Sequence, residues 1–143
     1  MTEPSVPEAS AAPATPSPSL ISMTLLVYAL FGVAAVASFV SSGLVAVWPL
    51  VGLVGIVGLI IAYIKRDEAA GTWLESHLRW LIRTFWLSLL WDVIGVIVLV
   101  TLGLILVGIP IAIGIWIVTA IWVIYRLLRG YMLFKDSKAV PGA

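Results

Sequence analysis

Residues 85–126 read FWLSLLWDVIGVIVLVTLGLILVGIPIAIGIWIVTAIWVIYR, an apolar run in which only two residues are charged. One helix through the whole run would extend about 60 Å at about 1.5 Å per residue, twice the roughly 30 Å thickness of a bilayer's hydrocarbon core. The run must therefore turn back on itself. Gly108-Ile109-Pro110 is the natural turn, because proline suits the first turn of a helix. We predict two membrane spans here, at 85–107 and 110–126.

The composition places the whole chain in a membrane. Of its 143 residues, 62% are hydrophobic and 10% charged, whereas a soluble domain is about half apolar and about a quarter charged. A net charge of +1 argues against a nucleic-acid partner, which needs a basic patch. The chain has no cysteine, one histidine and none of the common hydrolase, zinc-protease or phosphate-loop motifs. We therefore predict a non-enzymatic protein with no catalytic, cofactor-binding or metal-binding residues.

Two further apolar runs precede this pair and complete the predicted fold. Each is long enough to cross a bilayer, at 20–40 and 44–64, and Ser41-Ser42-Gly43 lies between them as a turn. Because Pro49 cannot sit inside a regular helix, the second helix should begin near Trp48. We predict an all-α integral membrane four-helix bundle over residues 20–134.

Both ends of the chain differ from this bundle. Residues 1–19 hold five of the eight prolines and no Lys or Arg, which is typical of a disordered Pro/Ala/Ser-rich tail. Residues 135–143 are expected to form a short basic tail.

The basic residues predict the orientation. All eight fall in two places. The first group lies between spans two and three and consists of Lys65, Arg66, Arg79 and Arg83, and the second follows span four and consists of Arg126, Arg129, Lys135 and Lys138. The positive-inside rule places both groups on the cytoplasmic side. Four spans then put the N-terminus and the C-terminus in the cytoplasm, with the chain in the inner (plasma) membrane.

The segment 65–84 is expected to carry an interfacial helix over about 72–84 that runs into span three, either bent or continuous. Thr72 and Glu75 have the spacing of a capping box, in which the Thr72 hydroxyl accepts the Glu75 N–H and the Glu75 carboxylate reaches back. Glu75 and Arg79 are spaced as an i,i+4 ion pair. Tryptophans favour headgroup depth. The candidate docking residues for anionic lipid or a partner are Trp73, Glu75, His77, Arg79, Trp80 and Arg83.

Two other interpretations of this segment stay open. It is either a topology signal with aromatic anchors and no binding role, or an active site in which His77 would be the only acid–base group.

The same segment resembles a known family. The stretches that carry the resemblance are YIKRDE at 63–68, GTWLESH at 71–77, RW at 79–80 and IRTFW at 82–86. They resemble the DUF4870 or Tic20-like group of small bacterial membrane proteins, over roughly residues 24–140. The resemblance implies a four-helix bundle and a distant link to a chloroplast protein-import translocon. It also leads us to expect a small residue at position 92, so a role for Asp92 would be particular to this chain.

Asp92 is the notable polar residue within the spans. A carboxylate near the middle of a span costs at least ~2.5 kcal/mol, so an intramembrane acid is a functional candidate. The predicted polar seam consists of Thr84, Ser88, Asp92 and Thr119. Asp92 is interpreted either as a neutral packing acid bonded to Ser88, Thr119 or a carbonyl, or as a proton- or cation-sensing group. A third alternative is an acid that faces a water defect or a self-association contact.

Small residues predict where the helices approach closely, because lipid provides no hydrophobic drive between them. The candidate packing positions are Gly32, Ala35, Gly52, Gly55 and Gly58.

Together these features favour a scaffold or accessory subunit that binds partner proteins or anionic lipid through residues 65–86. The alternative is an oligomeric transport or channel component, as in Tic20-like translocation, with the seam around Asp92 lining the path. The expected partners are membrane lipids and either another membrane protein or further copies of the chain.

Overall fold

A computed structural model describes residues 15–41 and 48–143 of the protein. Its elements are α1 (Pro18–Val40), α2 (Trp48–Arg66), α3 (Trp73–Leu102), the short 3₁₀ helix η2 (Gly103–Ile105) and α4 (Gly108–Lys135). The described residues contain no strand, so the predicted all-α class is confirmed for them.

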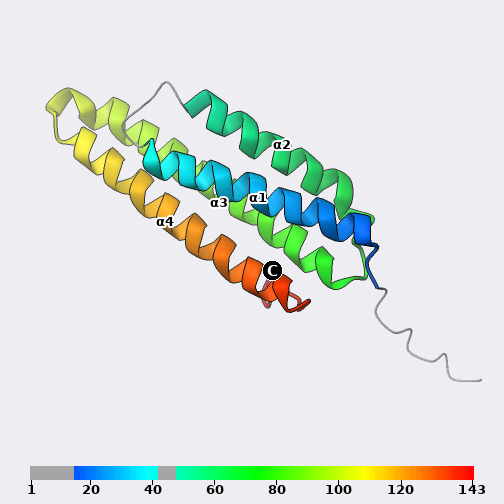
Figure 1. Ribbon diagram of the computed structural model, residues 1–143. Helices are drawn as coiled ribbons and strands as arrows, with labels where there is room; N and C mark the ends of the chain where they lie inside the picture. Colours follow the sequence, from blue (N-terminus) through cyan, green and yellow to red (C-terminus); the bar gives the residue numbers. More distant parts are fainter. Residues whose placement is uncertain (1–14, 42–47) are drawn as a thin grey trace, which may run out of the picture.

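The four long helices run antiparallel to their chain neighbours. The start of α1, the end of α2, the start of α3 and the end of α4 lie together at one end of the bundle (Figure 1). The packing is most extensive between α3 and α4 and between α1 and α2. The bundle is thus built from two helical hairpins, which meet where α1 contacts α4 and where α2 contacts α3.

All four helices are long and apolar enough to cross a membrane. Their outer faces expose large hydrophobic side chains such as Val33, Leu50, Val100 and Val118, each more than 60% exposed. An apolar surface of this extent suits lipid and not water. The chain is therefore a multi-pass membrane protein.

The helix starts follow from local sequence signals. Ser17 caps α1 by accepting the Leu20 N–H at 3.3 Å, and Pro18 occupies the first turn. The predicted tail 1–19 was therefore too long by two residues, and its first fourteen lie outside the described residues. The second helix begins at Trp48, as predicted, whereas most of the predicted turn at Ser41-Ser42-Gly43 falls outside the described residues.

The predicted helix over about 72–84 is continuous with the third span, which is one of the two arrangements that the sequence left open. Residues 72–84 and the third span form the single 30-residue helix α3, because no glycine or proline interrupts the sequence between Trp73 and Gly95. At about 1.5 Å per residue this helix is about 45 Å long, more than the roughly 30 Å of hydrocarbon. It therefore extends beyond the apolar core, and it starts at the end of the bundle where α1 begins and α4 ends (Figure 1).

The capping box at the start of α3 forms only in part. The Glu75 carboxylate accepts the Gly71 N–H at 3.0 Å, but the Thr72 hydroxyl donates to the Ala69 carbonyl oxygen at 2.7 Å. The Glu75 N–H is bonded instead by the Thr72 carbonyl oxygen at 3.2 Å. The Thr72 hydroxyl is thus bonded within the turn that precedes the helix, and it does not cap the helix as the sequence pattern predicts.

The turn between α3 and α4 lies earlier than predicted. The third span ends at Leu102 and not at 107, and η2 and Leu106, with φ of 60°, complete the reversal. Gly108 then packs on the backbone of Leu102 and Gly103, where a Cβ would find no space. The fourth helix is correspondingly longer than predicted and continues past Arg126 to Lys135.

Only some of the predicted small-residue positions make close helix contacts. A Cβ on Gly58 would lie 2.6 Å from the Phe31 ring, and one on Gly55 would lie 3.3 Å from the Phe85 ring. Ala35 is buried as well. Gly32 and Gly52, in contrast, have nothing within 4 Å of an added Cβ, so the prediction of close packing is wrong for these two.

Two helical glycines on α2 therefore provide a matched pair for testing the hairpin contact. Gly58→Ala should destabilise the protein by about 1–3 kcal/mol, because the new methyl group collides with Phe31. Gly52→Ala should stabilise it by about 0.5–1 kcal/mol, since alanine costs less conformational entropy in a helix. Unfolding in detergent micelles measures both. Equal stability of the two variants would contradict the packing described here.

Candidate functional site

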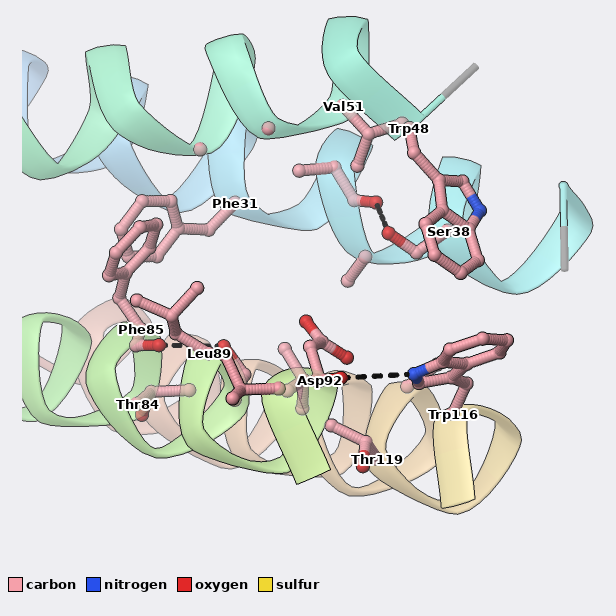
Figure 2. Close-up of a pocket in the computed structure, with 18 of the residues that line it drawn as sticks. Phe31, Ser38, Trp48, Val51, Thr84, Phe85, Leu89, Asp92, Trp116 and Thr119 are labelled. Carbon is pink, nitrogen blue, oxygen red and sulfur yellow. Dashed lines mark hydrogen bonds between the residues drawn. The ribbon is translucent and has the colours of Figure 1, made fainter. Parts of the chain in front are cut away.

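A cavity of about 510 Å³ lies between the α1–α2 hairpin and the α3–α4 hairpin. Side chains from all four helices line it (Figure 2). The four residues of the predicted polar seam are among them: Thr84, Ser88, Asp92 and Thr119. The structure thus brings these four together at one cavity.

The hydroxyl groups of the seam bond to their own helices. Ser88 donates to the Phe85 carbonyl oxygen at 2.8 Å, and Thr119 donates to the Ile115 carbonyl oxygen at 2.8 Å. A neutral Asp92 would have to donate its own proton to one of these hydroxyl oxygens. Among the described residues no hydrogen bond joins the Asp92 carboxyl group to Ser88 or Thr119, so the interpretation as an acid bonded to either of them does not fit the observed geometry.

Asp92 presents its carboxyl group to the cavity. Figure 2 shows this group pointing into the space between the two hairpins. The backbone carbonyl oxygen of Asp92 accepts the Trp116 indole N–H at 3.3 Å. Within the described part of the chain, the carboxyl group itself has no hydrogen-bond or ion-pair partner.

Aromatic pairs connect the hairpins on either side of Asp92. The rings of Phe31 and Phe85 stack at a centroid distance of 5.9 Å, and those of Trp48 and Trp116 meet edge to face at 4.5 Å. The first pair joins α1 to α3 and the second joins α2 to α4. The cavity therefore has aromatic walls as well as aliphatic ones.

A second polar cluster lies beside the cavity, around Arg126. The Arg126 Nε–H donates to the Thr84 hydroxyl at 2.6 Å, and the guanidinium carbon lies 3.5 Å from the centre of the Trp80 ring. The Trp80 indole N–H donates back to the Arg126 carbonyl oxygen at 3.2 Å. Thr84, which in turn donates to the Trp80 carbonyl oxygen, thus belongs to both the seam and this cluster.

The Arg126 cluster is rich in positive charge. Arg83 and Arg129 lie close enough for their charges to repel that of Arg126. The two ion pairs of the described residues are elsewhere, between Lys65 and Glu68 and between Arg79 and Glu75, so no carboxylate neutralises the three arginines. The sequence placed Arg126 at the membrane boundary, but nothing in its spacing indicated the contacts with Thr84 and Trp80.

His77 is a buried structural residue. Its Nε2 lies 2.6 Å from the Lys138 carbonyl oxygen, which can only accept, so Nε2 carries a hydrogen. Its Nδ1 lies 2.8 Å from the Tyr28 hydroxyl, and the Trp73 and Phe134 rings meet its ring edge to face. The side chain is 0% exposed. His77 therefore ties α1 and the end of the chain to α3.

The predicted docking residues separate into two groups. His77 and Trp80 are buried inside the bundle, and Trp73 is half-buried against Phe134, so these three do not form an exposed docking face. The exposed face of α3 carries Arg79, which is paired with Glu75 at 2.6 Å, and Arg83. His77 is covered by residues 136–143, which fold back on α3, where the Val140 N–H donates to the Ser76 hydroxyl at 3.0 Å. Trp80 and Trp73 are covered by Arg126 and Phe134 of α4.

No catalytic or metal-binding arrangement is evident in the described residues. They contain no group of three or more His, Cys, Asp or Glu side chains that could hold a metal ion. His77 uses both ring nitrogens in structural contacts.

No family model matches the chain, and no curated protein or solved structure matches it either. The resemblance to the DUF4870 or Tic20-like group stays a prediction from the motifs at 63–86.

The bond between Tyr28 and His77 yields a stability prediction. Tyr28→Phe leaves the buried Nδ1 of His77 without a partner, which should cost about 1–3 kcal/mol of unfolding free energy. Tyr125→Phe is the matched control, because that ring is 60% exposed. Reversible unfolding in micelles measures both variants. If the two variants were equally stable, the hydrogen bond would not hold α1 on α3.

Proposed function

We propose that this chain is a non-enzymatic inner-membrane protein, with both termini in the cytoplasm, that binds anionic lipid at its basic end. The observation that carries the proposal is the group of three arginines, Arg83, Arg126 and Arg129, that no carboxylate of the described residues neutralises. Uncompensated positive charge next to apolar spans fits the anionic headgroups of a cytoplasmic leaflet.

The geometry of Arg126 supports a phosphate ligand. A guanidinium can hold a phosphate through two parallel hydrogen bonds. The Arg126 side chain is fixed by its stacking on Trp80 and by the hydrogen bond from Nε to Thr84. Its two terminal nitrogens have no hydrogen-bond partner in the described residues, so they can bind a phosphate. Less side-chain entropy is then lost when a headgroup binds.

The same basic end also suits an acidic partner protein, as a scaffold or accessory subunit would need. We prefer lipid because Arg83 and Arg126 lie within helices that are otherwise apolar enough to span the membrane. A long arginine side chain at such a position extends to the depth of the lipid phosphates. In this proposal the scaffold role follows from lipid binding.

Replacing the two exposed arginines tests the proposal. The double variant Arg83→Gln/Arg129→Gln should lose roughly 2 kcal/mol of binding to phosphatidylglycerol, about 30-fold, at about 1 kcal/mol per basic residue. Arg79→Gln is the control, because Arg79 is already paired with Glu75. Lipid titration followed by native mass spectrometry measures the affinities. The proposal fails if phosphatidylcholine binds as well as phosphatidylglycerol, or if Arg79→Gln is as damaging as the double variant.

The proposed orientation can be tested by single-cysteine labelling, because the natural chain contains no cysteine. In intact cells an impermeant maleimide should label Ile109→Cys, in the first turn of α4, but not Ala70→Cys, in the α2–α3 turn. Both positions are exposed. After cell lysis both should react, which confirms that each thiol is accessible. Labelling of Ala70→Cys in intact cells would invert the orientation.

One observation favours the alternative, an oligomeric transport or channel component of the Tic20-like kind. The four seam residues line one cavity, as a path through the protein would require. A path across the membrane would need further copies of the chain to complete it. Lipid binding needs only the charges of a single chain, and we therefore prefer it.

A further inference from the structure

The cavity around Asp92 has no role in lipid binding at the basic end, and its chemistry points to a ligand of its own. We propose that it binds a lipophilic organic monocation, with the positive centre beside the Asp92 carboxylate and the apolar groups between the two hairpins. The inference rests on the cavity and its surroundings, and does not depend on whether the arginine cluster binds lipid.

The charge of the ligand follows from the lining. Asp92 is the only charged residue among the described residues that line the cavity. Its carboxylate has no partner within the described chain, although it points into the space between the hairpins (Figure 2). One unpaired negative charge in an apolar surrounding is complemented by one positive charge.

The walls favour an organic cation over an inorganic one. A metal ion is usually held by several His, Cys, Asp or Glu side chains, and the described residues contain no group of three or more of these. The aromatic rings of Phe31, Phe85, Trp48 and Trp116 instead line the space on either side of Asp92. Aromatic faces attract quaternary cations, and a volume of about 510 Å³ lies within the range of roughly 300–1,000 Å³ usual for small-molecule sites.

Access to the cavity also selects for a lipophilic ligand. Lining residues of α2 and α3, including Ile56, Val93 and Val96, are 43–48% exposed. In this proposal the ligand enters between these two helices from the surrounding lipid. A ligand that enters by this route must first dissolve in the bilayer.

The arginine cluster fixes where the positive centre can lie. Arg126 bonds to Thr84, at the end of the cavity nearest the basic end of the bundle, and repels a cation there. Asp92 is eight residues further along α3, about 12 Å away at about 1.5 Å per residue. The cation is thus held at Asp92, between Phe85 and Trp116.

Binding of tetraphenylphosphonium to the purified full chain in detergent tests this inference. Equilibrium dialysis should show one saturable site per chain. Tetraphenylborate has the same shape and the opposite charge, and should bind at least tenfold more weakly. Asp92→Asn should weaken tetraphenylphosphonium binding at least tenfold, whereas Asp67→Asn, an exposed carboxylate in the α2–α3 turn, should leave it unchanged.

A second variant tests the location of the site independently of charge. Gly52 lines the cavity and has nothing within 4 Å of an added Cβ, so Gly52→Leu should fill the space without disturbing the helix contacts. It should reduce binding at least tenfold, while circular dichroism confirms the helical fold.

Three results would overturn the inference. The first is the absence of saturable binding of the cation, and the second is unchanged binding by Asp92→Asn or Gly52→Leu. The third is equal binding of the cation and the anion, which would show an uncharged slot that takes lipid acyl chains. Because Arg83 and Arg129 do not line the cavity, the arginine double variant should keep the site intact whether or not it loses lipid.

Discussion

A hydrocarbon surrounding offers no hydrogen-bond partners, so a polar group of a helix is stabilised only by a partner within the chain or by a bound ligand. Hydroxyl groups on α1, α3 and α4 find a partner on their own helix, because each donates to the carbonyl oxygen four residues earlier. The residues concerned are Thr24, Ser38, Thr84, Thr101 and Thr119. Longer side chains find a partner on another helix, as Trp80 does with Arg126 and Trp86 with Tyr63. No buried side-chain nitrogen or oxygen of the described residues lacks a partner.

The same constraint explains which parts of the fold could be predicted from the sequence. Helices bond within themselves, so the spans appear as runs of apolar residues, and the predicted starts at 20 and Trp48 lie within two residues of those observed. Breaks are local as well, and Gly108-Ile109-Pro110 marked the α3–α4 reversal to within a few residues. α3 is continuous because no glycine or proline separates its amphipathic start from the third span. The amphipathic pattern alone does not distinguish a continuous helix from a bent one.

The candidate site was predictable only where it lies on one helix. Thr84, Ser88 and Asp92 recur at intervals of four on α3 and line one cavity. The burial of His77, in contrast, depends on Tyr28 and on Lys138, which are 49 and 61 residues away in the chain. Gly130 was missed for the same reason, because the side chain that approaches it most closely, Tyr28, comes from another helix. Local spacing carries no information on such pairings.

Arg126 and Asp92 show how two opposite charges can coexist in one bundle without pairing. About 12 Å apart, at an effective dielectric constant of about 20, they attract each other by only about 1.4 kcal/mol. That is less than the cost of at least ~2.5 kcal/mol for a carboxylate at mid-span, so the attraction alone cannot compensate Asp92. Arg126 has Trp80 and Thr84 as neighbours that stabilise its charge. Asp92 has no equivalent among the described residues, so the compensation must come from a proton or from a cation that enters the cavity.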